Sequence, residues 1–118
     1  MFWDQSEDFL GLIPNSTAAA AAVGNASTAG GDGFAPEEWG QVLNLSRFTG
    51  KPMLAALCAP GLSRSLEVTP DGDVVASLLR ALRRVYGAAV PAAPRHAIVT
   101  RWGRDPHALG SHSYYAGG

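Results

Sequence analysis

Pro-Asp-Gly-Asp-Val-Val-Ala-Ser-Leu-Leu-Arg-Ala-Leu-Arg-Arg-Val-Tyr-Gly, at residues 70–87, is the stretch with the most regular pattern in the chain. Its large apolar side chains recur at spacings of three and four, so we predict an amphipathic α-helix over residues 70–86. Such a helix needs a covering element, and short apolar runs elsewhere favour a β-sheet in that role. The predicted inner face consists of Val74, Val75, Leu78, Leu79, Leu82, Val85 and Tyr86, and the outer face of Ser77, Arg80, Arg83 and Arg84.

Both ends of this helix carry sequence signals. Thr69 is the predicted N-cap, and Pro70 then occupies the first helical position, where its missing N–H costs nothing. Asp71 and Asp73 suit the positive end of the helix dipole. Gly87 is expected to end the helix.

Two neighbouring segments have the patterns of paired strands. Residues 53–59 are almost continuously apolar, as in a strand covered on both faces. The turn Thr-Gly-Lys-Pro at 49–52 would join this segment to residues 39–45 in a hairpin. Residues 39–45 alternate, with Trp39, Gln41, Leu43 and Leu45 expected on one side and Gly40, Val42 and Asn44 on the other.

Two further segments complete the predicted sheet. Residues 9–13 are a short apolar run, and residues 97–102 are rich in β-branched and aromatic side chains. A short helix is expected over residues 61–68. The predicted fold class is therefore α+β: a mixed, mainly antiparallel sheet with one long amphipathic helix packed on it.

Composition excludes several classes of protein. The chain has 118 residues, 47% of them hydrophobic, which suffices for one domain with a modest core. A net charge of −1 gives no global reason to expect nucleic acid or a membrane as partner, and the arginines at 80, 83 and 84 are the ordinary outer face of a helix. Cys58 is the single cysteine, which excludes an internal disulfide, fits a reducing compartment and suits a small packed side chain.

Residues 15–33 are of low complexity. Their alanine run is too short to overcome the cost of helix nucleation, so a disordered insertion is expected. The Gly-Asp-Gly at 31–33 lacks the third glycine, the preceding strand and the following helix of a dinucleotide-binding loop.

The carboxyl-terminal region, residues 96–118, contains the most specific motif. After Trp102, Gly103 and the pair Asp105-Pro106 are expected to break the strand, with Asp105 as a turn former that can pair with an adjacent arginine. A second extended piece at 111–115 would place His112 and Tyr114 on one face. Trp102, His112 and Tyr114 would then be presented to one side.

A family resemblance is carried by these residues. Thr-Arg-Trp at 100–102, followed by Asp-Pro and then by Gly-Ser-x-Ser-Tyr, resembles the flavin-containing amine oxidases, closest to the lysine-specific histone demethylase and polyamine oxidase branch. Phe2-Trp3-Asp4 resembles the same branch. The resemblance implies that residues 1–118 are an incomplete chain, holding much of the substrate-binding domain of a two-domain FAD-dependent oxidoreductase. It also implies a polyamine or a methylated lysine as the amine substrate of the parent enzyme.

The resemblance further implies roles for the three ring-bearing residues. Trp102 would be a wall beside the flavin, binding the cofactor, and His112 and Tyr114 would line the amine site, because aromatic rings offer a rigid apolar surface that also attracts cations. The alternative is that Trp102 is a core residue. His112 departs from the tyrosine usual in this branch, and a charged imidazole there would oppose a cationic amine. His107 likewise replaces a common aromatic residue, and Leu109 a common basic one.

Several expected features of the family are missing from the sequence. The chain has no glycine-rich motif for the FAD pyrophosphate, and its only lysine, Lys51, lies in a predicted turn. We therefore expect that the chain alone has no catalytic residue, does not retain FAD and does not oxidise amines. The three histidines have no metal-site spacing. The alternative function is a noncatalytic protein-interaction module derived from the same fold; nucleic-acid binding through the helix arginines is a third, weaker hypothesis.

Overall fold

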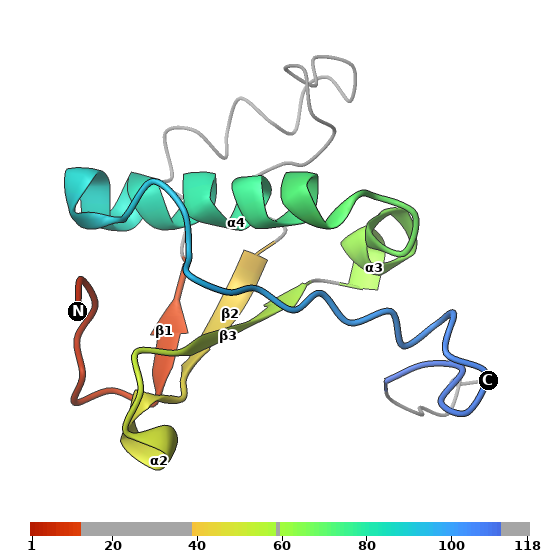
Figure 1. The fold of residues 1–118 in the computed structure, drawn as a ribbon, viewed down its shortest axis with the longest axis horizontal. Helices are drawn as coiled ribbons and strands as arrows, with labels where there is room; N and C mark the ends of the chain where they lie inside the picture. The colour runs from red at the N-terminus through yellow and green to blue at the C-terminus, as the bar shows by residue number, and fades with distance from the viewer. Residues whose placement is uncertain (13–38, 59, 112–118) are drawn as a thin grey trace, which may run out of the picture.

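A three-stranded sheet and one long helix form the body of the molecule (Figure 1). The computed structural model describes residues 1–12, 39–58 and 60–111. The strands lie in the order β1-β2-β3, and both pairs are antiparallel. The elements are β1 (Phe9–Gly11), β2 (Trp39–Asn44), α2 (Ser46–Thr49), β3 (Leu54–Cys58), α3 (Pro60–Leu66), α4 (Asp71–Tyr86) and the 3₁₀ turn η2 (Gly87–Ala89).

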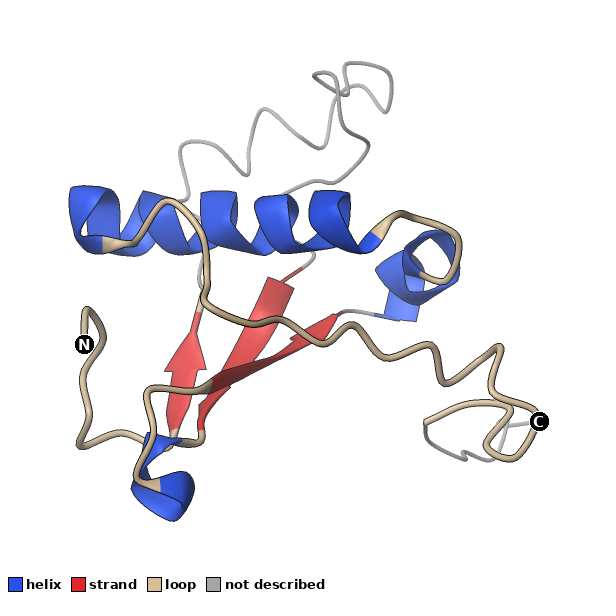
Figure 2. Ribbon diagram, viewed as in Figure 1, coloured by secondary structure: helices blue, strands red, loops and turns tan. Residues whose placement is uncertain are grey.

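The core lies between the sheet and α4, which runs crosswise to the strands (Figure 2). Val42, in the middle of β2, is fully buried, and Leu82 of α4 is 3% exposed. Burial of each such side chain contributes about 1.5–3 kcal/mol, so the packing of α4 on the sheet stabilises the fold. The buried apolar set is Trp3, Leu10, Leu12, Trp39, Val42, Leu66, Val74, Ala81, Leu82 and Val90.

The predicted alternation along β2 is wrong at its start. Trp39 pairs with Cys58 and Gln41 with Leu57, so Gly40 is an extra residue in a β-bulge. Because a bulge reverses the alternation of side chains, Trp39 lies on the buried face with Val42, not with Gln41.

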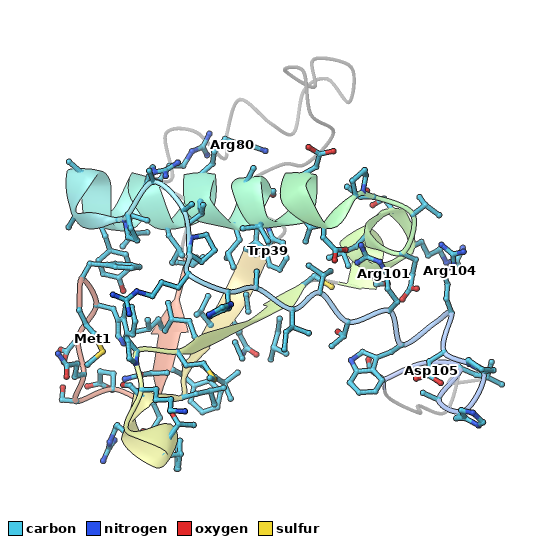
Figure 3. All side chains as sticks on the ribbon, viewed as in Figure 1. Met1, Trp39, Arg80, Arg101, Arg104 and Asp105 are labelled. Carbon is cyan, nitrogen blue, oxygen red and sulfur yellow. The ribbon has the colours of Figure 1, made fainter. Side chains whose placement is uncertain are left out.

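The bulge also explains a second correction, on α4. The indole Nε1 of Trp39 donates a hydrogen bond to Ser77 Oγ at 2.9 Å, and Ser77 is buried instead of lying on the outer face as predicted. Arg80 does lie on the side of α4 away from the sheet (Figure 3). Val85, predicted on the inner face, is 50% exposed.

The predicted helix is confirmed, with one change at its start. Pro70 is the N-cap, and its carbonyl accepts the N–H groups of Asp73 and Val74. Thr69, the predicted N-cap, instead donates its hydroxyl to the carbonyl of Ser65 at 2.8 Å. Gly87 ends the helix with a φ of 60°, a value that glycine adopts without strain.

The amino-terminal arm is fastened to the sheet through one buried amide. Trp3, 8% exposed, donates its indole N–H to Asn44 Oδ1 at 3.1 Å, and Asn44 Nδ2 donates to the carbonyl of Glu7 at 2.9 Å. Phe2 packs edge-on against Trp3 and Tyr86, with ring centroids 4.8 and 5.4 Å apart. The arm therefore folds back onto the core of its own chain.

The predicted fourth strand, residues 97–102, is not part of the sheet. This segment is extended but unpaired: Val99 packs against the core, whereas Ile98 is 91% exposed. Strand propensity favours an extended backbone, but a strand also needs a partner edge. Among the described residues the sheet is therefore antiparallel rather than mixed, and Leu57 of β3 is 48% exposed rather than covered. The insertion predicted at 15–33 lies outside the described residues.

Candidate functional site

Trp102 lies in a pair of consecutive turns. The carbonyl of Arg101 accepts the N–H groups of Arg104 and Asp105, and the carbonyl of Asp105 accepts those of Ala108 and Leu109. The Asp105 carboxylate also accepts the N–H of His107 at 2.8 Å. Asp105 is therefore a turn former, as predicted.

Two anchors hold this turn to the connection between α3 and α4. The guanidinium of Arg101 donates to the carbonyl of Thr69 at 2.7 Å and to the carboxylate of Asp71 at 2.6 Å. The N–H of Gly103 donates to Glu67 Oε1 at 2.9 Å. Figure 3 shows Arg101 and Arg104 beside this connection, with Asp105 farther out. The residues on either side of Trp102 are thus both tied to residues 67–71, which we call the anchor turn.

The surface beside Trp102 is hollowed. The hollow has a volume of about 550 Å³ and is lined by Val99, Thr100, Arg101, Trp102, Arg104, Asp105, Pro106 and His107. Trp102 itself is 48% exposed, so it is not a core residue of the described fold. A half-exposed indole on an anchored turn offers a flat apolar surface to another group.

A half-exposed indole is chemically compatible with the ring of a flavin nucleotide, whereas the phosphates of the nucleotide need a separate site. A pyrophosphate binds where backbone N–H groups and positive charge converge, typically at a helix amino terminus. The first turn of α4 instead carries Asp71 and Asp73, whose carboxylates repel a diphosphate. The described residues therefore offer a ring face at Trp102 but no cradle for the phosphates at that helix.

Metal binding has no support in the described part of the chain, where no group of three or more metal-ligating side chains occurs. None of the helices described there is long and apolar enough to cross a membrane. The side chains of His96 and His107 are exposed.

His112 and Tyr114 lie outside the described residues, so their position beside Trp102 stays a prediction. The sequence interpretation missed Glu67 and the structural role of Arg101. The sequence predicts that Asp105 can pair with an adjacent arginine, but Arg101 pairs with Asp71, 30 positions earlier. No local pattern marks a contact of that range, because it depends on where the fold places the anchor turn.

Comparison with known proteins identifies the family. The family described as flavin containing amine oxidoreductase matches residues 2–118. Histone demethylase-like protein A of Aspergillus fumigatus is 31% identical over 117 residues, which are 98% of this chain and 10% of that relative. Polyamine oxidase 4 of Oryza sativa subsp. japonica is 33% identical over 89 residues, covering 75% of this chain and 18% of that relative.

A third relative agrees with these two. Lysine-specific histone demethylase 1 homolog 3 of Oryza sativa subsp. indica is 43% identical over 72 residues, covering 58% of this chain and 9% of that relative. No solved structure shows a significant match. The chain thus spans 9–18% of the length of these three relatives. Because the family match covers residues 2–118, the chain belongs to the flavin-containing amine oxidoreductase family.

Proposed function

We propose that this chain forms part of the substrate-binding domain of an FAD-dependent amine oxidase, with Trp102 as a wall beside the flavin. The observation that carries the proposal is the placement of this indole: it is half exposed, yet both of its neighbours in sequence are anchored. An indole left exposed while its backbone is fixed suits a surface that receives a planar group. Family membership supplies the identity of that group.

His112 and Tyr114 complete the proposed site by lining the space for the amine. When bound, FAD supplies the oxidation of the carbon beside the amine. The role of the chain is to hold that carbon in place and to exclude water. The relatives' names favour a polyamine or a methylated lysine as the substrate.

The proposal predicts that the 118-residue chain alone neither retains FAD nor oxidises amines. The reasons are that the sequence has no glycine-rich motif for the pyrophosphate and that the first turn of α4 carries Asp71 and Asp73. The test is to purify the chain in the presence of FAD, remove free cofactor and record the flavin absorbance. Stoichiometric flavin would contradict this part of the proposal.

A chimera tests the positive part. The matching segment of the Aspergillus relative, which aligns with 98% of this chain, is replaced by this chain, and oxidation of a methylated-lysine peptide is measured. Trp102→Ala is expected to lower kcat/KM by about tenfold or more, the loss expected when a positioning surface is removed. Phe48→Ala is the matched control, because Phe48 is an aromatic residue 75% exposed and distant in sequence. Equal activity in the two variants would contradict the proposal.

A noncatalytic interaction module is the second candidate, favoured by exposed apolar side chains. Ile98, Leu109 and Val68 are 91%, 76% and 75% exposed. Exposed groups of this kind can mark a protein-binding surface or a face that the rest of a larger fold covers. An autonomous module should run as one species in gel filtration, whereas part of a larger domain should self-associate through these uncovered side chains.

A further inference from the structure

We propose that Glu67 is a positioning residue that places the backbone of Trp102 by accepting a hydrogen bond from the N–H of Gly103. This inference rests on the proposed function in one respect only: that Trp102, once placed, serves as a wall beside the flavin. The hydrogen bond between Glu67 and Gly103, which we call the clamp, is formed entirely by described residues. Glu67 directly follows α3 and lies 36 positions before Gly103, so the contact joins two distant parts of the chain.

The contact between Glu67 and Gly103 is close and specific. Glu67 Oε1 accepts the Gly103 N–H at 2.9 Å, and a carboxylate acceptor makes this hydrogen bond stronger than one between neutral groups. A Cβ atom added to Gly103 would lie 3.1 Å from the same oxygen. A side chain at position 103 would therefore require the Glu67 carboxylate to shift by a few tenths of an ångström.

The second anchor fixes the other side of Trp102. Arg101 donates to the carbonyl of Thr69 and to the carboxylate of Asp71, and its side chain is 23% exposed. The side chain of Asp71 is 70% exposed, so solvent screens this ion pair and it adds little by itself. Glu67 is therefore the more important of the two acids, and the Thr69 carbonyl is the firmer part of the second anchor.

The anchor turn is itself rigidly placed. Leu66 precedes it and Val74 follows it, and both belong to the buried core, at 8% and 4% exposure. A shift of the anchor turn would disturb the packing between α4 and the sheet. Three short hydrogen bonds, two from Arg101 and one from Gly103, therefore tie the backbone on either side of Trp102 to a turn that is itself flanked by core residues.

Hydrogen exchange at the Gly103 amide tests the clamp directly on the 118-residue chain. Glu67→Ala should accelerate exchange at Gly103 about tenfold or more, while the amide of Leu82 in the core helix changes by less than about twofold. Glu67→Gln keeps an oxygen acceptor and should retain most of the protection. Glu7→Ala removes an exposed carboxylate that makes no hydrogen bond with the described residues, and should leave both amides unchanged.

Three outcomes would overturn the proposal. An unprotected Gly103 amide in the unaltered chain would mean that the clamp does not form. Equal exchange in Glu67→Ala and Glu7→Ala would mean that Glu67 does not hold Gly103. Parallel acceleration at Gly103 and Leu82 would mean that Glu67 supports the fold as a whole rather than placing Trp102.

The same variants in the chimera separate this proposal from the proposed function. If Trp102 is a flavin wall, Glu67→Ala should lower kcat while Glu67→Gln largely restores it. If exchange at Gly103 depends on Glu67 but activity responds to neither Trp102→Ala nor Glu67→Ala, the clamp stands and the flavin role fails.

Discussion

The two halves of the described molecule are held together by different forces. The arm, the sheet and α4 are joined by a continuous apolar core, with polar contacts both at buried points such as Asn44 and at the surface, where Arg47 donates to Asp8. The segment after Val90 instead exposes Ile98 and Leu109 and is attached mainly through polar contacts to the anchor turn. Burial is cooperative, whereas a few polar contacts act locally. The first half, which comprises the arm, the sheet and α4, should therefore unfold cooperatively. The second half, the segment after Val90, should detach locally while the first half stays folded.

The largest effect is expected at Trp39, in the first half. Trp39→Ala removes a large side chain that is 4% exposed and leaves the hydroxyl of Ser77 without its indole donor. The free energy of unfolding should fall by about 3–5 kcal/mol, a large fraction of the roughly 5–15 kcal/mol typical of native proteins. Circular dichroism should show loss of the native helix signal. A retained native signal in Trp39→Ala would mean that burial does not hold this half together.

A smaller but still cooperative loss is expected at Asn44. Asn44→Ala leaves the indole N–H of Trp3 and the carbonyl of Glu7 without their partners inside the protein. The indole N–H of Trp3 is buried, and a buried unpaired group costs about 1–3 kcal/mol. The arm should become susceptible to limited proteolysis before α4 does. If the protease cut α4 before the arm, Asn44 would not be the residue that fastens the arm to the sheet.

The next largest effect on stability is expected from Glu67→Ala, which weakens the attachment of the second half. Glu67→Ala should lower the global free energy of unfolding by no more than about 1 kcal/mol, because it removes one hydrogen bond at the surface. Chemical denaturation measures the global free energy of unfolding, and the exchange rate of the Gly103 amide measures the local opening of the second half. If Glu67→Ala lowered the global free energy of unfolding as much as Asn44→Ala does, the two halves would not be held together by different forces.

The smallest effect is a pH dependence at Tyr86. Burial, and then the negative charge of Asp4, raise the pKa of Tyr86 above its ordinary 10.0. The folded state thus favours the neutral phenol, so this contribution to stability is fully present below pH 10.0 and is lost as pH rises through the raised pKa. Tyr86→Phe should flatten the alkaline fall in Tm. An identical alkaline profile in both proteins would assign the loss to other groups.

Sequence reasoning succeeded where local pattern and burial coincide. The helix over 70–86 and the strands near residues 9, 39 and 53 follow from apolar periodicity and from the stop signal at Gly87. It failed where one residue changes the register, as Gly40 does in β2, because the bulge is not visible in an alternating pattern. It failed again at 97–102, where propensity is strong but no partner strand is paired in the described structure.

The candidate site was predictable only in part, for a related reason. Trp102 could be singled out from its motif, but the residues that hold its backbone could not. Glu67 and Asp71 lie on the anchor turn, and their contacts depend on how α3 and α4 pack. Side chains that support a site from a distance carry no local signal.

Flavin fluorescence in the chimera tests the central claim most directly, because a stacked indole quenches the emission of an isoalloxazine ring. Trp102→Phe should raise the emission per bound flavin, while Phe48→Ala should not. Unchanged emission in Trp102→Phe at equal flavin content would show that this indole does not lie against the cofactor.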